Sequence, residues 1–430
     1  MAAHSAYDTK VPQEKAIVVG IDRGSKLWSL QDSLEELKSL TETAGAQVVA
    51  QTSQKLIKPN SRTFVGSGKA EEIASLCRTY AADIVIFDDE LTPSQQTNLE
   101  KIVPKTVKII DRTALILDIF ALHATTKEGR LQVRLAQNQY LLPRLRGMWA
   151  HLASNRMGGG VGSRFGEGES QLEVDRRMVR DRITSIKREL KQVDATRKLQ
   201  RESRYASGMY KIAFAGYTNA GKSSLLNALT DANVLSYDKL FATLDSTTRK
   251  YTLPEGREIT LTDTVGFIQK LPHNLVNAFK PTLNELLGAD LILHVIDASS
   301  LDCEAQIESV NQVLEEIGAA DIALLKVYNK IDRLDADKLD DLKAEHPDAM
   351  FISAAKEIGL EDLLEKITSI ASSVDEHLYL TIPFSRGDLA SLAHSRTTII
   401  SEKFAEEGTV LEILAPASVA GRFHEFVTKE

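Results

Sequence analysis

The chain has 430 residues, of which 43% are hydrophobic and 26% charged, and its net charge is −8. These values are typical of a globular protein in water with room for about three domains. No run of residues approaches the roughly 20 apolar positions that a membrane span needs, and the N-terminus lacks the apolar core of a secretory signal. The only cysteines, Cys77 and Cys303, are too few for a disulfide framework or a thiolate metal site. We therefore expect a cytoplasmic protein with no membrane span and no disulfide partner.

The first part of the chain, 1–110, alternates short apolar runs with amphipathic stretches. Strand and helix in alternation indicate a small parallel α/β domain, because parallel neighbours need a helical crossover between them. The pattern predicts strands at 16–20, 47–51, 84–88 and 107–111, and helices at 29–44 and 69–80.

The second part, 111–206, has a helical pattern. It predicts helices at 112–124, 128–145 and 171–204, with a Gly-rich loop at 158–168. Steps of four, three, four and three residues predict a coiled-coil seam on the last helix. The seam consists of Val179, Ile183, Ile186, Leu190 and Val193. We expect two long helices to form a projecting hairpin around the Gly-rich tip.

The charge is unevenly distributed, and the hairpin is its basic part. Between 127 and 204 the chain has 18 Lys and Arg residues against 9 Asp and Glu, although the whole chain is acidic. No acidic residue lies between Arg130 and Arg164. A basic segment of this kind indicates a polyanionic partner, and its arginines suit contacts with RNA phosphates. The predicted RNA-binding residues are Arg144, Arg146, Arg156 and Arg164. The alternative is a solvated helical pair that only spaces two domains.

The third part, 207–373, opens with a strand at 211–215 that leads into G-x-x-x-x-G-K-[ST]. A helix at 222–229 follows, which is the context that a phosphate-binding loop requires. Backbone N–H groups and the helix N-terminus would surround the phosphates, Lys222 would reach the β- and γ-phosphates, and Ser223 would bind Mg²⁺. The predicted phosphate-binding residues are Gly216, Tyr217, Thr218, Asn219, Ala220, Gly221, Lys222, Ser223 and Ser224.

Two further stretches complete the phosphate and metal site. The sequence L-T-D-T-V-G at 261–266 places Asp263 to hold Mg²⁺ through water, and Gly266 to meet the γ-phosphate with its N–H. A threonine-rich segment at 241–249 lies between the two motifs and includes Phe241 and Thr243. Its Thr247 hydroxyl is expected to complete the Mg²⁺ shell only when the γ-phosphate is present.

The base-reading residues follow two later strands, at 323–328 and 350–352. Asp332 would accept hydrogen bonds from the N1–H and amine of guanine, an edge that adenine lacks. Lys330 would lie over the ring, and Asn329 would tie this loop to the phosphate loop. Backbone N–H groups of Ser353, Ala354 and Ala355 would meet guanine O6. The sequence therefore predicts that GTP and GDP are the ligands.

The C-terminal part, 374–430, is predicted to be a small α+β domain. Its expected strands are 376–384, 397–404 and 409–415, and its expected helices are 386–395 and 418–427. The fold class is thus α/β: a P-loop GTPase domain, preceded by a small parallel α/β domain with a long helical hairpin and followed by this α+β domain.

The catalytic residues are predicted to be Lys222, Gly266 and Asn219. Phe267 stands where many GTPases carry a Gln that orients the attacking water, and a benzyl group cannot hydrogen-bond water. Asn219 has two interpretations of equal weight. It either helps to hold K⁺ beside the phosphates or is a turn residue without catalytic function.

With these motifs assembled, the chain resembles the HflX family of GTPases from end to end. The resemblance rests on F-V-G-S-G-K-A-E-E-I at 64–73, F-D-D-E-L-T-P-S-Q-Q-T-N-L at 87–99, D-R-T-A-L-I-L-D-I-F at 111–120 and P-R-L-R-G at 143–147. One departure falls in the tip, where the family usually has G-P-G-E-T-Q-L-E. This chain has Glu167 in place of Pro and Ser170 in place of Thr.

The resemblance implies a ribosome-associated GTPase whose N-terminal part docks on RNA of the large subunit near the peptidyl-transferase region. It also implies that the protein separates stalled ribosomes under stress. We expect a cytoplasmic monomer. The sequence leaves open whether it associates peripherally with ribosomes or membranes. Two alternatives remain: a GTPase of large-subunit assembly, and a nucleotide-gated module that binds ribosomes without catalysis.

Overall fold

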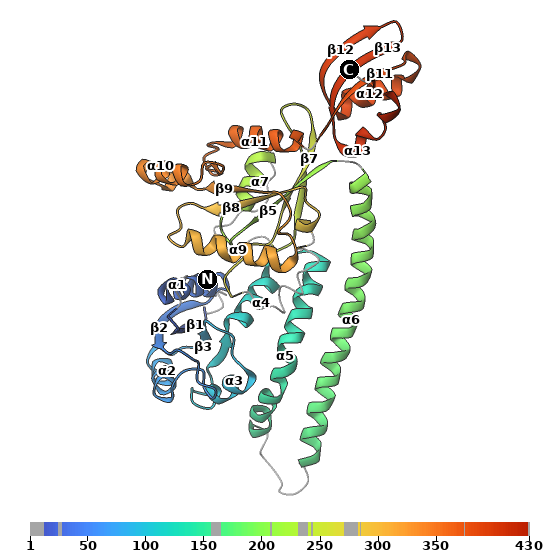
Figure 1. Ribbon diagram of the computed structural model, residues 1–430. Coiled ribbons are helices and arrows are strands. Elements are labelled where there is room, and N and C mark those ends of the chain that lie inside the picture. Colours follow the sequence, from blue (N-terminus) through green and yellow to red (C-terminus); the bar gives the residue numbers. More distant parts are fainter. Residues whose placement is uncertain are drawn as a thin grey trace, which may run out of the picture. The chain divides into compact units, whose positions relative to one another are not determined.

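The structure is a computed structural model, and it divides the chain into two units (Figure 1). It describes residues 13–24, 28–155, 165–206, 209–230, 240–241, 244–270, 283, 285–373 and 375–428. The first unit comprises 1–190 with 239–241 and 270–278, and the second comprises 191–238, 242–269 and 279–430. The predicted domain boundaries after 110, 206 and 373 stay predictions.

The first unit is built on a four-stranded parallel sheet with strand order β2-β1-β3-β4. Its strands are β1 (Lys15–Asp22), β2 (Gln47–Lys55), β3 (Ile84–Phe87) and β4 (Lys108–Asp111). Its first helices are α1 (Leu30–Thr43), α2 (Ser67–Tyr80) and α3 (Pro93–Glu100). Six consecutive residues of β1 are buried, as expected for a strand that is covered on both faces. The predicted alternation of strand and helix is confirmed.

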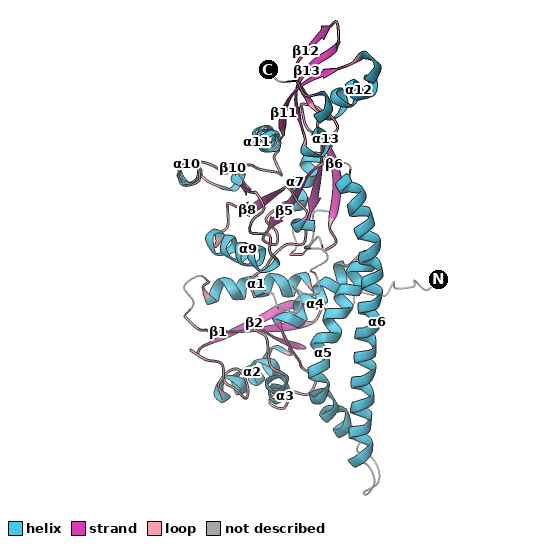
Figure 2. Cartoon of the chain, turned by 45° about the vertical axis from the view of Figure 1, so that its right-hand side comes forward, coloured by secondary structure: helices cyan, strands magenta, loops and turns pink. Residues whose placement is uncertain are grey.

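Three helices follow, of which the last two are long: α4 (Arg112–His123), α5 (Lys127–Asn155) and α6 (Phe165–Ala206). In both views α5 and the first half of α6 run side by side (Figures 1 and 2). The five seam positions of α6 are all partly buried. The predicted loop at 158–168 is wrong at its end, because α6 already begins at Phe165 and includes Gly166 and Gly168. Residues 156–164 lie outside the described part of the chain.

The second unit contains a six-stranded sheet with order β10-β9-β8-β5-β7-β6. Its strands are β5 (Tyr210–Gly216), β6 (Thr247–Thr252), β7 (Glu258–Asp263), β8 (Leu291–Asp297), β9 (Leu324–Asn329) and β10 (Met350–Phe351). All neighbours are parallel except β6 and β7. The helices are α7 (Lys222–Thr230), α9 (Cys303–Ile317), α10 (Ala336–Glu345) and α11 (Leu360–Ser373). The carboxyl ends of the parallel strands therefore share one edge of the sheet.

The same unit ends in a three-stranded antiparallel sheet with order β11-β13-β12. Its elements are β11 (Glu376–Ile382), α12 (Gly387–Arg396), β12 (Thr398–Ala405), β13 (Gly408–Ala415) and α13 (Ala417–Ala420). The predicted helix at 418–427 is too long, because α13 already ends at Ala420. The chain turns at Gly421, buries Phe423 in the core and pairs Val427 with Leu380 in a β-bridge. The predicted α/β class is confirmed, and no described helix is long and apolar enough to cross a membrane.

Candidate nucleotide-binding site

The loop between β5 and α7 is held in place by the backbone. Thr218 N–H donates to the Phe267 carbonyl at 2.7 Å, and Phe267 N–H donates to the Gly216 carbonyl at 3.0 Å. Gly221 has a φ of +95°, and a Cβ there would lie 2.2 Å from Asn329 Nδ2. Asn219 is exposed and also has a left-handed φ of 61°. The loop conformation therefore requires glycine at position 221.

Lys222 lies beneath this loop and is 6% exposed. Its Nζ donates to the carbonyls of Gly216 at 3.1 Å and Tyr217 at 2.9 Å. Burial lowers the pKa of Lys222 to about 8. A Cβ on Gly266 would lie 3.1 Å from the same Nζ, so the backbone of Gly266 borders the ammonium group. A phosphate oxygen bound here would meet both groups.

Three residues with side-chain oxygens lie at the start of α7, the end of β7 and the start of β6. Ser223 Oγ donates to Asp263 Oδ2 at 2.6 Å, and Asp263 is fully buried. Thr247 lies opposite Asp263 in the antiparallel pairing of β6 and β7, so the two side chains share a face of the sheet. Hydroxyl and carboxylate oxygens are the hard ligands that Mg²⁺ prefers. The residues present thus fit a magnesium site that phosphate oxygens would complete.

The base-reading loops are tied to the phosphate loop through Asn329, which is 2% exposed. Its Nδ2 donates to the Ala220 carbonyl at 2.9 Å, and its Oδ1 accepts from Ala354 N–H at 3.0 Å. Ser353 Oγ donates to Asp332 Oδ1 at 2.6 Å, and this hydrogen bond holds the pKa of Asp332 below its usual value. Asp332 is therefore a carboxylate at neutral pH and can accept from a donor edge.

The sequence did not single out Asp297, which ends β8. Its Oδ2 accepts from Lys330 Nζ at 2.7 Å, and this contact holds a lysine whose backbone is left-handed, with φ 65°. No motif marks this aspartate. Sequence reasoning could still have identified it from its position. Asp297 ends an apolar strand, and the next strand along the chain precedes N-K-x-D.

Two predicted ligand-binding residues are not placed with the others. Phe241 belongs to the first unit, where it is 2% exposed and packs edge-to-face on Phe120 with ring centroids 4.6 Å apart. Thr243 lies outside the described residues.

The remaining residues singled out in the sequence differ in exposure. Ser224 is partly buried in α7, and Ala355 is exposed. Phe267 is 1% exposed, so its ring belongs to the core.

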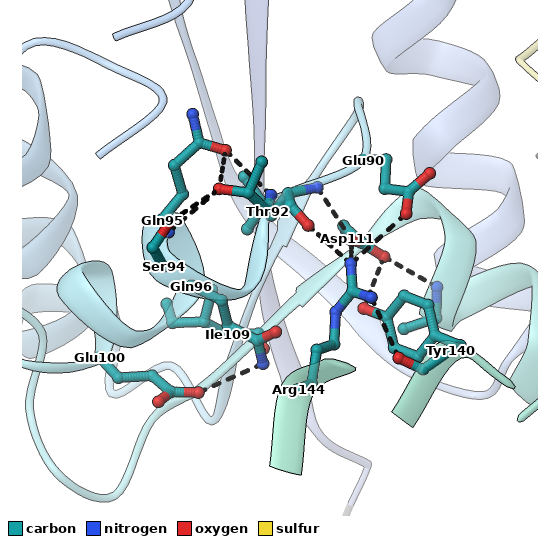
Figure 3. Close-up of polar contacts among 12 residues, drawn as sticks. Glu90, Thr92, Ser94, Gln95, Gln96, Glu100, Ile109, Asp111, Tyr140 and Arg144 are labelled. Atoms are coloured by element: carbon teal, nitrogen blue, oxygen red, sulfur yellow. Dashed lines mark hydrogen bonds and ion pairs between the residues drawn. The ribbon is translucent and has the colours of Figure 1, made fainter. Parts of the chain in front are cut away.

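The predicted RNA contact of Arg144 is corrected by its position in the first unit (Figure 3). The side chain is 7% exposed, and its guanidinium donates to the Leu91 carbonyl at 2.6 Å and to Asp111 at 3.2 Å. An arginine held in this way stabilises the fold and offers almost no surface to a phosphate. Arg146 lies in α5, but its side chain is outside the described part, as are Arg156 and Arg164.

Comparison with known proteins decides the family. Three family models match along the chain: "GTP-binding GTPase N-terminal" at 31–121, "GTP-binding GTPase Middle Region" at 123–204 and "50S ribosome-binding GTPase" at 211–330. A protein named GTPase HflX from Caldanaerobacter subterraneus subsp. tengcongensis is 45% identical, covering 96% of this chain and 94% of its own. The chain belongs to the HflX family of GTPases. GTPase HflX of Escherichia coli (strain K12) is 42% identical, covering 90% of each chain.

The HflX resemblance drawn from the motifs is thereby confirmed, and with it the assignment of a GTPase that binds GTP and GDP. Among solved structures, a GTP-binding protein from the archaeon Sulfolobus solfataricus in complex with GDP is 26% identical. The match covers 84% of this chain and 99% of the archaeal chain, with a TM-score of 0.42.

Proposed function

We propose that this HflX-family GTPase hydrolyses GTP with Mg²⁺ at the edge of its six-stranded sheet, docks on the large ribosomal subunit and separates stalled ribosomes. The observation that supports it most is the set of contacts at that edge. Buried Lys222, the Ser223–Asp263 pair and the Asp332–Ser353 pair all lie at or just beyond the carboxyl ends of β5, β7, β9 and β10. A site with these three parts fits a guanosine triphosphate and a hard cation.

Each residue has a proposed role in hydrolysis. Lys222 and the Gly266 N–H stabilise the charge that develops on the γ-phosphate, as charged donors in a water-poor site do. Ser223, Thr247 and Asp263 hold Mg²⁺, which supplies Lewis-acid charge to the β- and γ-phosphates. Phe267 has no hydrogen-bonding group and its ring is buried, so it does not orient the attacking water. Asn219 at the loop surface would help to hold K⁺, and the protein alone would turn GTP over slowly.

The ribosomal part of the proposal rests on the family and on charge. The third matched model is described as a 50S ribosome-binding GTPase. The acidic chain concentrates its basic residues between 127 and 204, which suits contact with ribosomal RNA. The proposed working parts are an α/β domain at 1–110, the hairpin at 111–206, the GTPase domain at 207–373 and the α+β domain at 374–430. We propose that the protein acts as a monomer.

The test measures GTP turnover by the full-length protein, alone and with purified large subunits, and then follows whole ribosomes by sedimentation. We expect slow turnover alone, acceleration by large subunits, and separation of whole ribosomes in the presence of a GTP analogue. Lys222→Ala is the control, because it removes the charge that binds phosphates. Acceleration without separation would favour a role in subunit assembly. Nucleotide-dependent binding without turnover would favour a non-catalytic module.

A further inference from the structure

The phosphate loop contains a buried hydroxyl group that takes no part in holding the loop together. Thr218 is 6% exposed, the same fraction as Lys222 beneath the loop. Its Oγ1 is buried, and no described residue forms a hydrogen bond with it. The contact that Thr218 makes with Phe267 uses its backbone N–H, which every residue except proline could supply. A buried polar group without a partner costs stability, so the presence of a hydroxyl here calls for a function.

The backbone around Thr218 is fixed to the segment that follows Gly266. Tyr217 pairs with Phe267 in a parallel β-bridge, and the Thr218 N–H donates to the Phe267 carbonyl at 2.7 Å. Further along, the Gln269 N–H donates to the Tyr217 hydroxyl at 2.8 Å. These contacts set the distance between the Thr218 side chain and the Gly266 backbone. A group that positions a reactant needs this kind of fixed support.

The Thr218 side chain borders the region where the γ-phosphate is expected. A Cβ on Gly266 would lie 2.9 Å from Thr218 Cα, 3.0 Å from Thr218 Cγ2 and 3.1 Å from Lys222 Nζ. The Gly266 N–H and the Lys222 ammonium are the groups that would meet the γ-phosphate. Because Oγ1 and Cγ2 are bonded to the same carbon, rotation about the Cα–Cβ bond brings the hydroxyl to the position of the methyl group.

The same region lacks the side chain that many GTPases use to orient the attacking water. Phe267 follows Gly266 and has no hydrogen-bonding group, and Lys222 has donors only. A threonine hydroxyl has two lone pairs and one O–H, so it can accept a hydrogen bond from water and donate one to a phosphate oxygen. Thr218 therefore offers the acceptor that is missing at position 267.

We propose that the Thr218 hydroxyl positions the attacking water beside the γ-phosphate. This inference rests on the GTP hydrolysis proposed above. The water oxygen forms the new bond to phosphorus while the bond to the bridging oxygen breaks, and GDP leaves with that electron pair. A proton of the water passes to an oxygen of the transferred phosphate. Thr218 orients the water and neither gains nor loses a proton.

The test compares hydrolysis with binding in the full-length protein. Single-turnover hydrolysis of GTP reports the chemical step, and calorimetric titration with a non-hydrolysable GTP analogue reports binding. Thr218→Val removes the hydroxyl and keeps the branched shape, so hydrolysis should slow about tenfold to a hundredfold. Affinity for the analogue should stay within about twofold, because the loop backbone and Lys222 bind the phosphates. Thr218→Ser keeps the hydroxyl and should retain most of the rate.

The matched control is Thr252→Val, at an exposed position of β6, which should change neither rate nor affinity. Melting temperature separates the proposed role from a structural one. Because the Thr218 hydroxyl has no partner, Thr218→Val should leave the melting temperature unchanged or raise it. Thr218→Ala removes the hydroxyl without adding a methyl group. It should slow hydrolysis in the same way, and it keeps the test decisive if valine does not fit.

Three results would overturn the proposal while leaving the proposed function intact. Folded Thr218→Val and Thr218→Ala could hydrolyse GTP as fast as the unaltered protein, or Thr218→Ser could be as slow as Thr218→Val. Alternatively, affinity for the analogue could fall as much as the rate, which would assign the hydroxyl to GTP binding. If the unaltered protein binds the analogue but hydrolyses no GTP, even with large ribosomal subunits, the proposed hydrolysis fails together with this inference.

Discussion

Lys222 binds backbone carbonyls in a buried position, and burial has lowered its pKa to about 8. Phosphate oxygens would raise that pKa in the complex, because they favour the charged amine. At a pH between the pKa of Lys222 in the free protein and its pKa in the complex, GTP binding should then be accompanied by the uptake of a proton. We expect the affinity to be constant below pH 8 and to fall up to roughly tenfold per pH unit above it. Titration in buffers of different ionisation enthalpy measures both effects, and an affinity that does not change between about pH 7 and 9.5 would contradict the assignment.

Asp332 presents a carboxylate that can accept from guanine, and the hydrogen bond from Ser353 fixes one of its oxygens and lowers its pKa further. Asp332→Asn replaces one acceptor with a donor, so we expect GTP affinity to fall by about two orders of magnitude. Xanthosine triphosphate should bind better, since its C2 oxygen needs a donor. Calorimetric titration with both nucleotides makes the comparison. Asp335→Asn, at an exposed carboxylate nearby, is the control, and unchanged GTP binding in Asp332→Asn would mean that the base is read elsewhere.

The left-handed backbone of Asn219 leaves both interpretations of this residue open, since a turn and a cation site can each use it. We expect GTP turnover to be faster in KCl than in NaCl at equal ionic strength. Asn219→Gly should remove the difference while it keeps the backbone conformation. Equal rates of the unaltered protein in both salts would leave Asn219 as a turn residue.

At the level of secondary structure elements, a buried ion-pair cluster connects β3, α4 and α1 of the first unit. Arg112 and Asp88 are each 1% exposed, and their side chains lie 2.6 Å apart. Arg112 also pairs with Glu36 at 2.7 Å, and Lys270, which belongs to this unit, pairs with Asp88. Lys270 also lies 3.3 Å from Asp89, which pairs with Arg23 at 3.5 Å, so the cluster matches three carboxylates with three cations. Removal of one member leaves a buried charge without its partner, which is costly.

We therefore expect Asp88→Asn to lower the free energy of unfolding by about 3 kcal/mol or more, measured by urea denaturation. Burial raises the pKa of Asp88, but Arg112 and Lys270 outweigh it and the net shift is downward. This stabilisation is thus present above the pKa of an unfolded aspartate and is lost as the pH falls through the lower folded value. Glu35→Gln, at an exposed ion pair of α1, should change stability by less than about 0.5 kcal/mol. Equal effects of the two substitutions would contradict the cluster's role.

The elements show which parts of the structure the sequence could predict. The strands that precede the nucleotide motifs were predicted correctly because they are apolar, and parallel strands bring their ends to one edge of the sheet. Helix α3 was missed because its Gln-rich sequence has no apolar repeat, although Thr92, Pro93 and Gln95 form a capping box. Arg144 was misassigned because charge alone cannot show that Asp111, 33 residues away, would bind it.

For the whole molecule, the burial of Arg144 reduces the set of hairpin arginines that can contact RNA. An arginine whose guanidinium is buried against Asp111 cannot serve in a test of RNA contact, because its loss would destabilise the first unit. The charges left for that test are Arg146, Arg156 and Arg164. They lie in a stretch without acidic residues, so their reversal changes the local field strongly.

The triple substitution of Arg146, Arg156 and Arg164 by Glu should abolish co-sedimentation with large ribosomal subunits in the presence of a GTP analogue. Phosphate contacts supply most of the affinity in such complexes, and glutamates at these positions would repel RNA. Basal GTP turnover should stay unchanged, because none of the three belongs to the nucleotide site. The matched control reverses three exposed lysines of the second unit, Lys338, Lys343 and Lys366, and should bind normally. Binding by the unaltered protein should weaken steeply with salt, and each single Arg→Ala should reduce the slope by about one. If the folded triple variant still sediments with large subunits, the hairpin is a spacer and the ribosomal contact lies elsewhere on the chain.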